Sequence, residues 1–355
     1  MFYVPGARLR VGMLTVHRED LAALEPEWRE LLGLCSSHAT IFQSPTWLRT
    51  WWGEFGGDRE LVLLSVRDEQ RLVGVVPLMR DGPRLSFAGD TEVCDYMDFP
   101  CTSGRESELL AALFRSLGEE PWDELSLWAL REDSPALAAL PVVCAEFGMT
   151  FASEHEDVCP QVGLVTAETG ARPGDFEEYV SSLDKKDRHE LRRKLRKLPQ
   201  AGEVDLEIIE APDEAASALD DFLWMLRESR ADKAEFMTPQ MESFFRKVVA
   251  SLASEGLIEI IFLKLGGKRA ACVLCFRARD ESLLWNSGYD PAYSHFSVGL
   301  LSKALALQRA IEQGKTRFDF LRGHERYKYE LGAKDLNVHR VVIRRDGTGN
   351  KEPGT

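Results

Sequence analysis

The sequence predicts an α/β protein of two tandem domains, each with a mixed central sheet flanked by helices. Strands of alternating apolar residues are interspersed with amphipathic helical stretches, and this pattern occurs twice along the chain. A turn-rich, weakly apolar segment, Thr166–Asp175, separates the two occurrences. The length of 355 residues also suits two domains of about 150 residues each. We expect an N-terminal domain over residues 1–165, a linker and basic helix over 166–202, and a C-terminal domain over 203–355.

The C-terminal half has the clearer pattern and opens with a strand and two helices. Residues Glu203–Glu210 alternate in polarity as a strand does. An amphipathic helix follows over about Asp213–Ser229, with acidic residues in its first turn. Thr238 suits the N-cap and Pro239 the first position of another helix, which we expect to end near Ser254.

Three strands come next. Leu257–Leu265 and Lys268–Arg277 flank the dipeptide Gly266–Gly267, which predicts a two-residue hairpin turn. Glu281–Gly288 is the third strand, and a turn-rich loop follows it at Tyr289–Ser297.

The half closes with a helix and two strands. The helix spans about Val298–Gln313 and ends at Gly314, a residue suited to helix C-termini. The strands are Arg317–Leu321 and Asn337–Arg344.

The N-terminal half shows a similar but less regular order. Its predicted strands are Leu9–Val16, Leu61–Val66, Leu72–Pro77, Arg84–Phe87 and Glu124–Leu127, and its predicted helices are Glu19–Leu32, Ser44–Glu54, Arg105–Leu117 and Ser134–Phe147. The shared order indicates a fold duplication, although no repeat of individual residues is visible.

The charge pattern excludes some functions and leaves others open. A net charge of −14 argues against a protein whose whole surface binds nucleic acid or anionic membrane. The segment Lys185–Leu198 nevertheless carries +6, which leaves −20 for the rest, and Leu191, Leu195 and Leu198 give it one apolar stripe. Three interpretations of this segment remain open. It is a connecting helix with a solvated face, or it binds a phosphate-rich ligand (CoA, a nucleotide-sugar or tRNA), or it lies on the surface of an anionic membrane.

Targeting and metal signals are weak. The longest apolar runs are strand-length, far below the ~20 residues of a membrane span, and MFYVPGARLR lacks the pattern of a signal peptide, so we expect a cytoplasmic protein. Cys272 and Cys275 form a CxxC on an alternating strand, where residues three apart point to opposite faces. We therefore expect seven free, mostly buried thiols and no metal site.

Several motifs carry a family resemblance. The segment YDPAYSHFSVGLLSKALALQRAIEQGKTRFDFLRGHERYKYELGA, Tyr289–Ala333, resembles the signature of the CelD-like GNAT acyltransferases, which are two-domain relatives of the FemABX aminoacyl transferases. In the N-terminal half, FQSPTWLRTWWGEFG, VGVVPLM and CDYMDF are similar to that group as well. The resemblance implies two tandem GNAT-like domains. One departure is that the Arg/Gln-x-x-Gly-x-Gly/Ala pyrophosphate loop is reduced to a single glycine, Gly299.

A donor site is expected at the start of the Val298 helix. Unpaired N–H groups at a helix N-terminus attract phosphate. The residues that would supply them are Ser297, Val298, Gly299 and Leu300. The resemblance adds an anion-binding role for Lys328, for which the alternative is a solvated lysine, and an oxyanion-binding backbone N–H near Asn286–Gly288.

Candidate catalytic residues follow the RFDFL strand. A mid-strand carboxylate is costly to bury without a partner, so Asp319 is either a site residue or half of an ion pair. The resemblance implies that Tyr327 protonates the leaving thiolate, with Tyr289 and Tyr293 as rivals. His324 as a general base and Glu325 complete the cluster, although a lone histidine there is more often structural.

The N-terminal half offers a substrate-side candidate. Asp95 and Asp98 flank Tyr96, and two carboxylates beside a tyrosine suit an amine or a sugar hydroxyl, the alternative being a surface loop. This half is interpreted as the degenerate, substrate-side copy.

The predicted function is N-acyl transfer from acyl-CoA, such as acetyl-CoA, to an amine of a small molecule or cell-envelope sugar, by direct attack. One alternative is a FemABX-like transferase that uses aminoacyl-tRNA, favoured by the reduced loop, Lys328 and the basic helix. Another is a non-catalytic scaffold in polysaccharide biosynthesis, which a filled loop before Gly299 would support.

Overall fold

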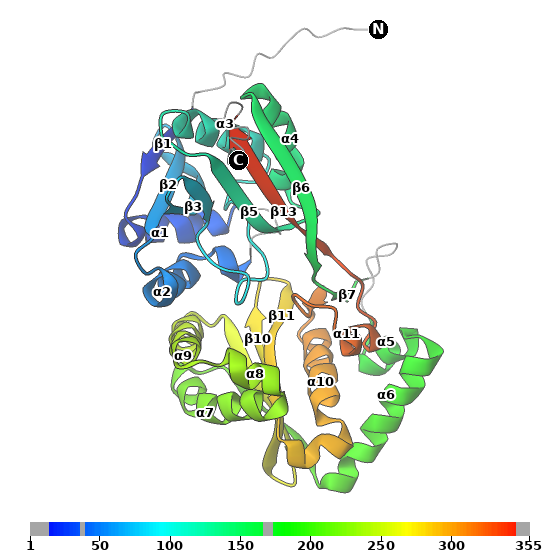
Figure 1. Cartoon of the computed structure of the whole chain (residues 1–355). Helices are drawn as coiled ribbons and strands as arrows, with labels where there is room; N and C mark the ends of the chain where they lie inside the picture. Colours follow the sequence, from blue (N-terminus) through cyan, green and yellow to red (C-terminus); the bar gives the residue numbers. More distant parts are fainter. Residues whose placement is uncertain (1–13, 36–39, 166–172, 346–355) are drawn as a thin grey trace, which may run out of the picture. The chain divides into compact units, whose positions relative to one another are not determined.

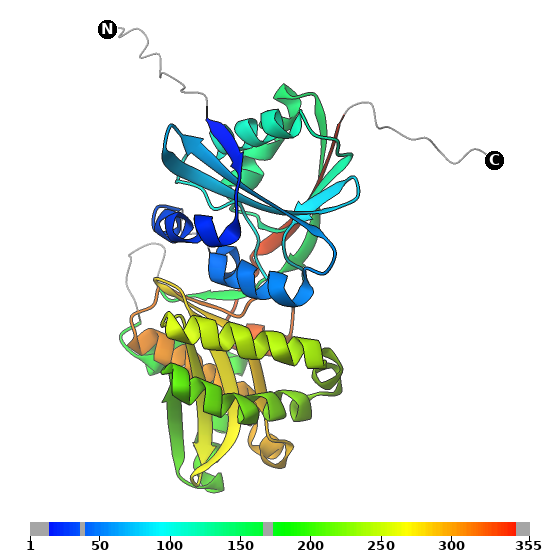
Figure 2. The same ribbon diagram turned by 90° about the vertical axis from the view of Figure 1, so that its left-hand side faces the viewer.

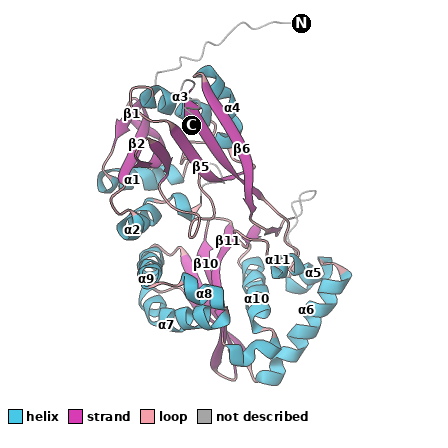
Figure 3. Ribbon diagram, in the orientation of Figure 1, coloured by secondary structure: helices cyan, strands magenta, loops and turns pink. Residues whose placement is uncertain are grey.

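The computed structural model describes residues 14–35, 40–165 and 173–345, and the chain divides into two compact units (Figure 1). Unit 1 contains Met1–Pro45, Asp58–Glu154 and His339–Thr355. Unit 2 contains Thr46–Gly57 and His155–Val338. Each unit has a sheet with helices packed against it (Figure 3).

Unit 1 is built on a seven-stranded sheet with the order β1-β2-β3-β4-β5-β13-β6. Strands β1 to β4 pair antiparallel in sequence, and β4 pairs parallel with β5. The strands are β1 Thr15–Arg18, β2 Glu60–Asp68, β3 Arg71–Asp81, β4 Arg84–Phe87, β5 Glu124–Arg131, β6 Met149–Val158 and β13 Asn337–Arg345. The helices are α1 Leu21–Leu32, η1 Ile41–Gln43, α3 Glu106–Leu117 and α4 Pro135–Glu146.

Unit 2 has a six-stranded sheet with the order β7-β12-β11-β10-β9-β8. Strands β8 to β11 pair antiparallel in sequence and β11 pairs parallel with β12, which is the pattern of β1 to β5. The strands are β7 Gln161–Gly163, β8 Val204–Ile209, β9 Ile258–Leu265, β10 Lys268–Arg277, β11 Glu281–Tyr289 and β12 Arg317–Asp319. The two mixed sheets and the repeated order confirm the predicted fold class.

The helices of unit 2 lie on both faces of its sheet. Helices α7 and α9 lie side by side over one face (Figure 2), and α10 packs on the other against β9, β10 and β11. The helices are α2 Pro45–Phe55, α5 Phe176–Ser182, α6 Lys185–Lys197, η2 Leu198–Ala201, α7 Pro212–Ser229, α8 Ala231–Phe236, α9 Pro239–Ser254, η3 Pro291–Phe296, α10 Val298–Glu312 and α11 Arg326–Glu330.

Unit 2 takes in the residues from His155 onward, including the basic helix, and the two units depart from the segments 1–165, 166–202 and 203–355 in two further places. Helix α2 lies in the first of these segments, yet Trp47 on this helix packs edge-on against Phe276 of β10 and Trp285 of β11, at centroid distances of 5.7 and 5.5 Å. Aromatic burial thus joins α2 to the core of unit 2.

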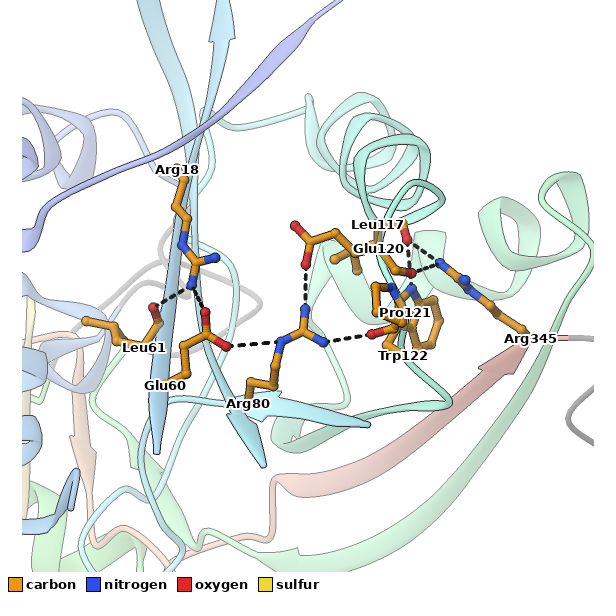
Figure 4. A network of polar contacts seen from close by, with 9 residues as sticks. All are labelled: Arg18, Glu60, Leu61, Arg80, Leu117, Glu120, Pro121, Trp122 and Arg345. Carbon is orange, nitrogen blue, oxygen red and sulfur yellow. Dashed lines mark hydrogen bonds and ion pairs between the residues drawn. The ribbon is translucent and has the colours of Figure 1, made fainter. Parts of the chain in front are cut away.

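The second place is β13, whose end lies in unit 1. Figure 4 shows a polar network there: Arg345 on β13 donates to the Glu120 carbonyl at 2.8 Å and stands over the Trp122 ring. The Glu120 carboxylate pairs with Arg80 on β3, and Arg80 also contacts Glu60. Strand β13 therefore joins the sheet of unit 1, between β5 and β6.

Most predicted elements are present, and Lys268–Arg277 has the predicted bounds. Strands β6 and β7 and helices α5 and α8 were not predicted, whereas α11 confirms the short helix expected between the last two strands. The predicted strand Leu9–Val16 and linker Thr166–Asp175 lie largely outside the described residues. No helix in the described ranges combines the length and apolar character that a bilayer span requires.

The cysteines are free and buried, as expected. Cys275 belongs to the apolar core that α10 covers, whereas the Cys272 thiol lies 4.0 Å from the Phe222 carbonyl of α7. The CxxC residues thus point to opposite faces of the sheet, which confirms the prediction. Within the described part of the chain, no His, Cys, Asp and Glu cluster could hold a metal ion.

Candidate functional site

The candidate site lies in unit 2, where β11 and β12 separate. β12 pairs with β11 only opposite Glu281–Leu283, while β11 continues to Tyr289. A pocket of about 290 Å³ opens beside the remaining edge of β11. The residues that line it come from α7, α8, β11, η3, α10 and α11, and they are Ser229, Arg230, Lys233, Ser287, Tyr289, Ser294, Ser297, Gly299, Leu300, Lys303, Glu325 and Tyr327.

A glycine in β11 brings α7 to this edge. A Cβ at Gly288 would stand 2.4 Å from the backbone of Met225 and Leu226, so only glycine permits this approach. Because α7 lies directly on β11, Ser229 and Lys233 at the junction with α8 reach the pocket.

The β11 edge presents backbone groups to the pocket. Ser287 receives a hydrogen bond from Lys233 at its carbonyl, and its N–H donates to the Asn286 side chain at 3.1 Å. Both backbone groups therefore point away from β10. Because alternate residues of a strand share an edge, the N–H of Tyr289 faces the same side.

Helix α10 begins at the pocket with open N–H groups. Its N-cap, Ser297, has φ +61°, and the N–H groups of Leu300 and Leu301 already donate to the Ser297 carbonyl at 3.0 Å. The N–H groups of Val298 and Gly299 belong to the first turn and have no partner within the helix. Of the four predicted N–H donors, these two remain open.

Gly299 makes room for an aromatic ring. A Cβ there would lie 2.9 Å from the ring of Tyr289, so the space is filled by this side chain rather than kept for a ligand. Packing of Tyr289 on α10 therefore uses the space that glycine provides at this position.

Two lysines face the pocket from opposite sides. Lys303 on α10, 8% exposed, donates to the Gly299 carbonyl at 2.6 Å and lies 4.7 Å from the centroid of the Tyr327 ring. Lys233 on α8 donates to the Ser287 carbonyl. Burial lowers the pKa of Lys303 to about 7 and that of Lys233 to about 8, and the charge of Lys233 adds to the effect on Lys303.

Tyr327 and Glu325 complete the lining. Burial raises the pKa of the Tyr327 hydroxyl above its usual range, so this group stays protonated near neutral pH. For Glu325, burial acts to raise the pKa, but Lys328 at 2.9 Å outweighs it and the pKa is lowered. The pocket therefore contains a neutral phenol and an ionised carboxylate.

Lys328 serves the backbone rather than the pocket. Its buried ammonium donates to the carbonyls of Leu321, Arg322 and Gly323 at 2.7–2.8 Å and pairs with Glu325. An ammonium has three protons to donate, so little capacity is left for an external anion. Through these contacts Lys328 fixes the backbone of residues 321–325, which precede Tyr327.

Asp319 and His324 lie outside the pocket lining. Asp319 is fully buried and accepts from the N–H of Leu321 at 2.7 Å, where the backbone has φ +57°. It therefore supports the strained turn after β12. His324 is exposed and does not line the pocket.

Residues 185–329 match the family model "Acetyltransferase (GNAT) domain". This part of the chain is therefore similar to a GNAT domain. The match covers β8 to β12 and α10, and it confirms the resemblance noted in the sequence for this half. No curated protein matches the sequence.

Solved structures extend the likeness to both units. A structure described as FemX has a TM-score of 0.62 at 12% identity, covering 92% of this chain and 96% of that chain. The C-terminal domain of a putative lysylphosphatidylglycerol synthetase from Agrobacterium fabrum has a TM-score of 0.56 at 11% identity, covering 91% and 92%. L-PGS from Bacillus licheniformis has a TM-score of 0.54 at 12% identity, with the same coverages. At these identities the likeness concerns the fold.

The substrate-side candidates lie in unit 1 and are buried. Tyr96 is fully buried and lies under the guanidinium of Arg131 at 5.1 Å. Asp98 accepts from the Ser134 hydroxyl at 2.7 Å, and burial raises its pKa to about 6. Asp95 is half-buried and, with Tyr96, does not line the cavity of about 10 Å³ beside Asp98. That cavity has room for about one water.

The basic helix α6 packs its apolar stripe inside unit 2. Leu191 and Leu198 are 2% exposed and belong to the core, so the stripe is not free to enter a membrane. The polar face borders an open groove of about 640 Å³ beside α11, which includes Lys186, Arg193 and Arg326. Of the three interpretations, the connecting helix and the phosphate-binding face both fit this packing.

The sequence predicted several of the lining residues but not Lys233 and Lys303. Lys303 is the only charged residue between Ser297 and Gln308, and a lone lysine in an apolar helix was the available signal. No sequence pattern marks Lys233 as a pocket residue, because it reaches the pocket only through the close contact of α7 with Gly288.

Proposed function

We propose that the protein is an N-acyltransferase that moves an acyl group from an acyl-CoA to an amine. The observation that carries this proposal is the pocket in the GNAT-like part of unit 2, where the open N–H groups of α10, the free edge of β11 and the Tyr327 hydroxyl meet. Its volume of about 290 Å³ also favours catalysis over the scaffold alternative, for which a filled loop before Gly299 was expected.

The proposed mechanism is direct attack of the amine on the thioester carbonyl. The donor phosphates would lie toward the N–H groups of Val298 and Gly299, which favour negative charge. The oxyanion of the tetrahedral intermediate would accept from the backbone N–H of Tyr289 on the β11 edge, because the N–H of Ser287 already donates to Asn286.

Proton transfer completes the reaction. Glu325 is the carboxylate among the lining residues and would take the proton that the attacking amine loses. The thiolate that leaves would take the proton of Tyr327, and the products are the amide and free CoA. The proton held by Glu325 then returns to the Tyr327 oxygen through solvent, which restores both side chains. No covalent intermediate with the enzyme forms.

The test is binding of the donor. Thermal shift and calorimetry with CoA, acetyl-CoA and butyryl-CoA should show saturable binding to the full chain. Ser294→Trp, which places a large side chain on a lining position, should abolish it. Ala292→Trp is the matched control, since Ala292 is exposed on the same turn η3 and does not line the pocket. The absence of binding by any CoA compound would refute the proposal.

Aminoacyl-tRNA is the second candidate donor, because the groove beside α6 is rich in cations. Lys186, Arg193, Lys194 and Arg326 border it, against three carboxylates. A tRNA arm in the same panel distinguishes the donors: saturable, salt-sensitive tRNA binding without CoA binding would favour this alternative.

A further inference from the structure

The pocket in the GNAT-like part of unit 2 has more positive charge than its own residues compensate. Arg230, Lys233 and Lys303 line it. Arg230 pairs with Asp232 at 2.7 Å outside the lining, and Glu325 is the single carboxylate among the described lining residues. Glu325 is already paired with Lys328 at 2.9 Å. The lining therefore favours a ligand that carries negative charge.

The two lysines keep hydrogen-bonding capacity for such a ligand. Lys303 donates to one neutral acceptor, the Gly299 carbonyl, and Lys233 donates to Ser287 and lies 3.5 Å from Asn286. Among the residues that the structure describes, neither ammonium forms an ion pair. A buried ammonium without an anionic partner is costly, which indicates that the partner comes with the substrate.

Lys315 provides a comparison, because it is a lysine of unit 2 with a structural role. Lys315 also donates to two backbone carbonyls, those of Ala278 and Arg279, at 2.9 and 3.1 Å. It lies outside the pocket lining. Lys233 and Lys303 differ from it because they converge on an open cavity from two separate elements, α8 and α10.

The position of the pair indicates which part of a substrate it meets. Lys233 bonds to the β11 edge at Ser287, where the proposed function places the reacting carbonyl. In an acyl-CoA, a neutral pantetheine arm separates the phosphates from that carbonyl. The anion beside the lysines is therefore a group close to the reacting atoms and not the pyrophosphate.

We propose that Lys233 and Lys303 together bind a carboxylate of the substrate, next to the bond that forms. This inference rests on the proposed function and deepens it to a substrate class. The carboxylate comes from one of two sources. It belongs to the acceptor, as in an α-amino acid whose ammonium meets Glu325, or to a dicarboxylic acyl group such as succinyl.

Matched ligand pairs separate the two sources. The donor arm compares succinyl-CoA with butyryl-CoA, which have equal chain length and differ in the terminal carboxylate. The acceptor arm compares the standard L-amino acids with their amides, in calorimetry and in a turnover assay with acetyl-CoA that follows free thiol. We expect one arm to prefer the carboxylate by about tenfold or more, the size of one charge-assisted contact.

Lysine variants test whether Lys233 and Lys303 cause the preference for the carboxylate ligand. Lys303→Met and Lys233→Met should each remove it, while Lys315→Met should keep it. Circular dichroism and the melting temperature report whether each variant folds. Equal affinity for both members of every pair in the wild type would overturn the proposal. So would a Lys303→Met variant that weakens binding of unacylated CoA as much as that of the preferred ligand, because the lysine would then serve the phosphates.

The outcome is distinguishable from failure of the proposed function. If CoA compounds bind but no carboxylate is preferred, the acyltransferase proposal stands and the inference falls. If amino acids bind through the lysines but CoA does not, the inference stands and the acyl-CoA donor falls.

Discussion

Units 1 and 2 share one strand order, yet the region after the fourth strand has opposite character in each. In unit 1, helix α3 carries Glu106 and Glu108 in its first turn, which neutralise its own N-terminus. The adjacent cavity measures about 10 Å³. In unit 2, the first turn of α10 has no acid, and the pocket of about 290 Å³ is lined by lysines. The same topology therefore holds a filled, acidic copy and an open, basic one.

The largest expected effect of this difference is on turnover. Tyr327→Phe removes the proposed proton donor and should lower kcat by about 10²–10³-fold with a nearly unchanged KM for acyl-CoA. Tyr96→Phe, in the filled unit, should change kcat by less than about threefold, since the ring is core. Steady-state kinetics on both variants makes the comparison. A loss with Tyr96→Phe that equals the loss with Tyr327→Phe would show that unit 1 takes part in the chemistry.

The next largest expected effect is on the free energy of unfolding, through packing at two glycines. A Cβ at Gly288 meets the backbone of Met225 and Leu226 at 2.4 Å, whereas a Cβ at Gly74 in unit 1 meets the flexible end of Leu109 at 2.0 Å. Side-chain ends move more easily than backbone. Gly288→Ala should therefore lower the free energy of unfolding by about 3 kcal/mol or more, and Gly74→Ala by about 1–2 kcal/mol. Urea unfolding compares them, and equal losses would mean that α7 is free to move off β11.

Local sequence signals predicted much of the fold. Thr238 caps α9 by accepting from the N–H of Met241 at 3.2 Å, as its sequence position indicates. Strand β6 was missed because MTFASEHEDV is polar and largely exposed, so its sequence lacks the apolar alternation of a half-buried strand. The return of β13 to the first sheet depends on contacts such as those of Arg345, which are distant in sequence.

The candidate site was predictable where its residues follow one another in the chain. Ser297, Gly299, Leu300, Glu325 and Tyr327 were chosen from motifs, and all five line one pocket. Burial and partners could not be derived in the same way. Whether a lysine bonds to three carbonyls, as Lys328 does, or faces a cavity, as Lys303 does, depends on the tertiary fold.

The smallest expected effects are opposite pH dependences of stability in the two units. Burial lowers the pKa of Lys303 to about 7, and Lys233, Cys272, Glu325 and Lys328 surround it from α8, β10 and the α11 segment. Below this pKa the folded protein holds a buried cation, and this cost fades as the pH rises toward the unfolded value of 10.5. Lys303→Met should therefore stabilise the protein at pH 6, by about 1–3 kcal/mol, and progressively less toward pH 10.

Asp98 in unit 1 should behave in the opposite way. Burial raises its pKa to about 6 from 3.8, so the folded protein holds a buried anion above pH 6, and the cost disappears as the pH falls through 6 toward 4. Asp98→Asn should stabilise by about 1–2 kcal/mol at pH 8 and hardly at pH 4, because an amide still accepts from Phe99 and the Ser134 hydroxyl can turn to accept. Urea unfolding across this pH range, with hydrogen exchange to locate each effect, tests both slopes. Slopes of the same sign would contradict the contrast, because the buried charge is a cation in unit 2 and an anion in unit 1.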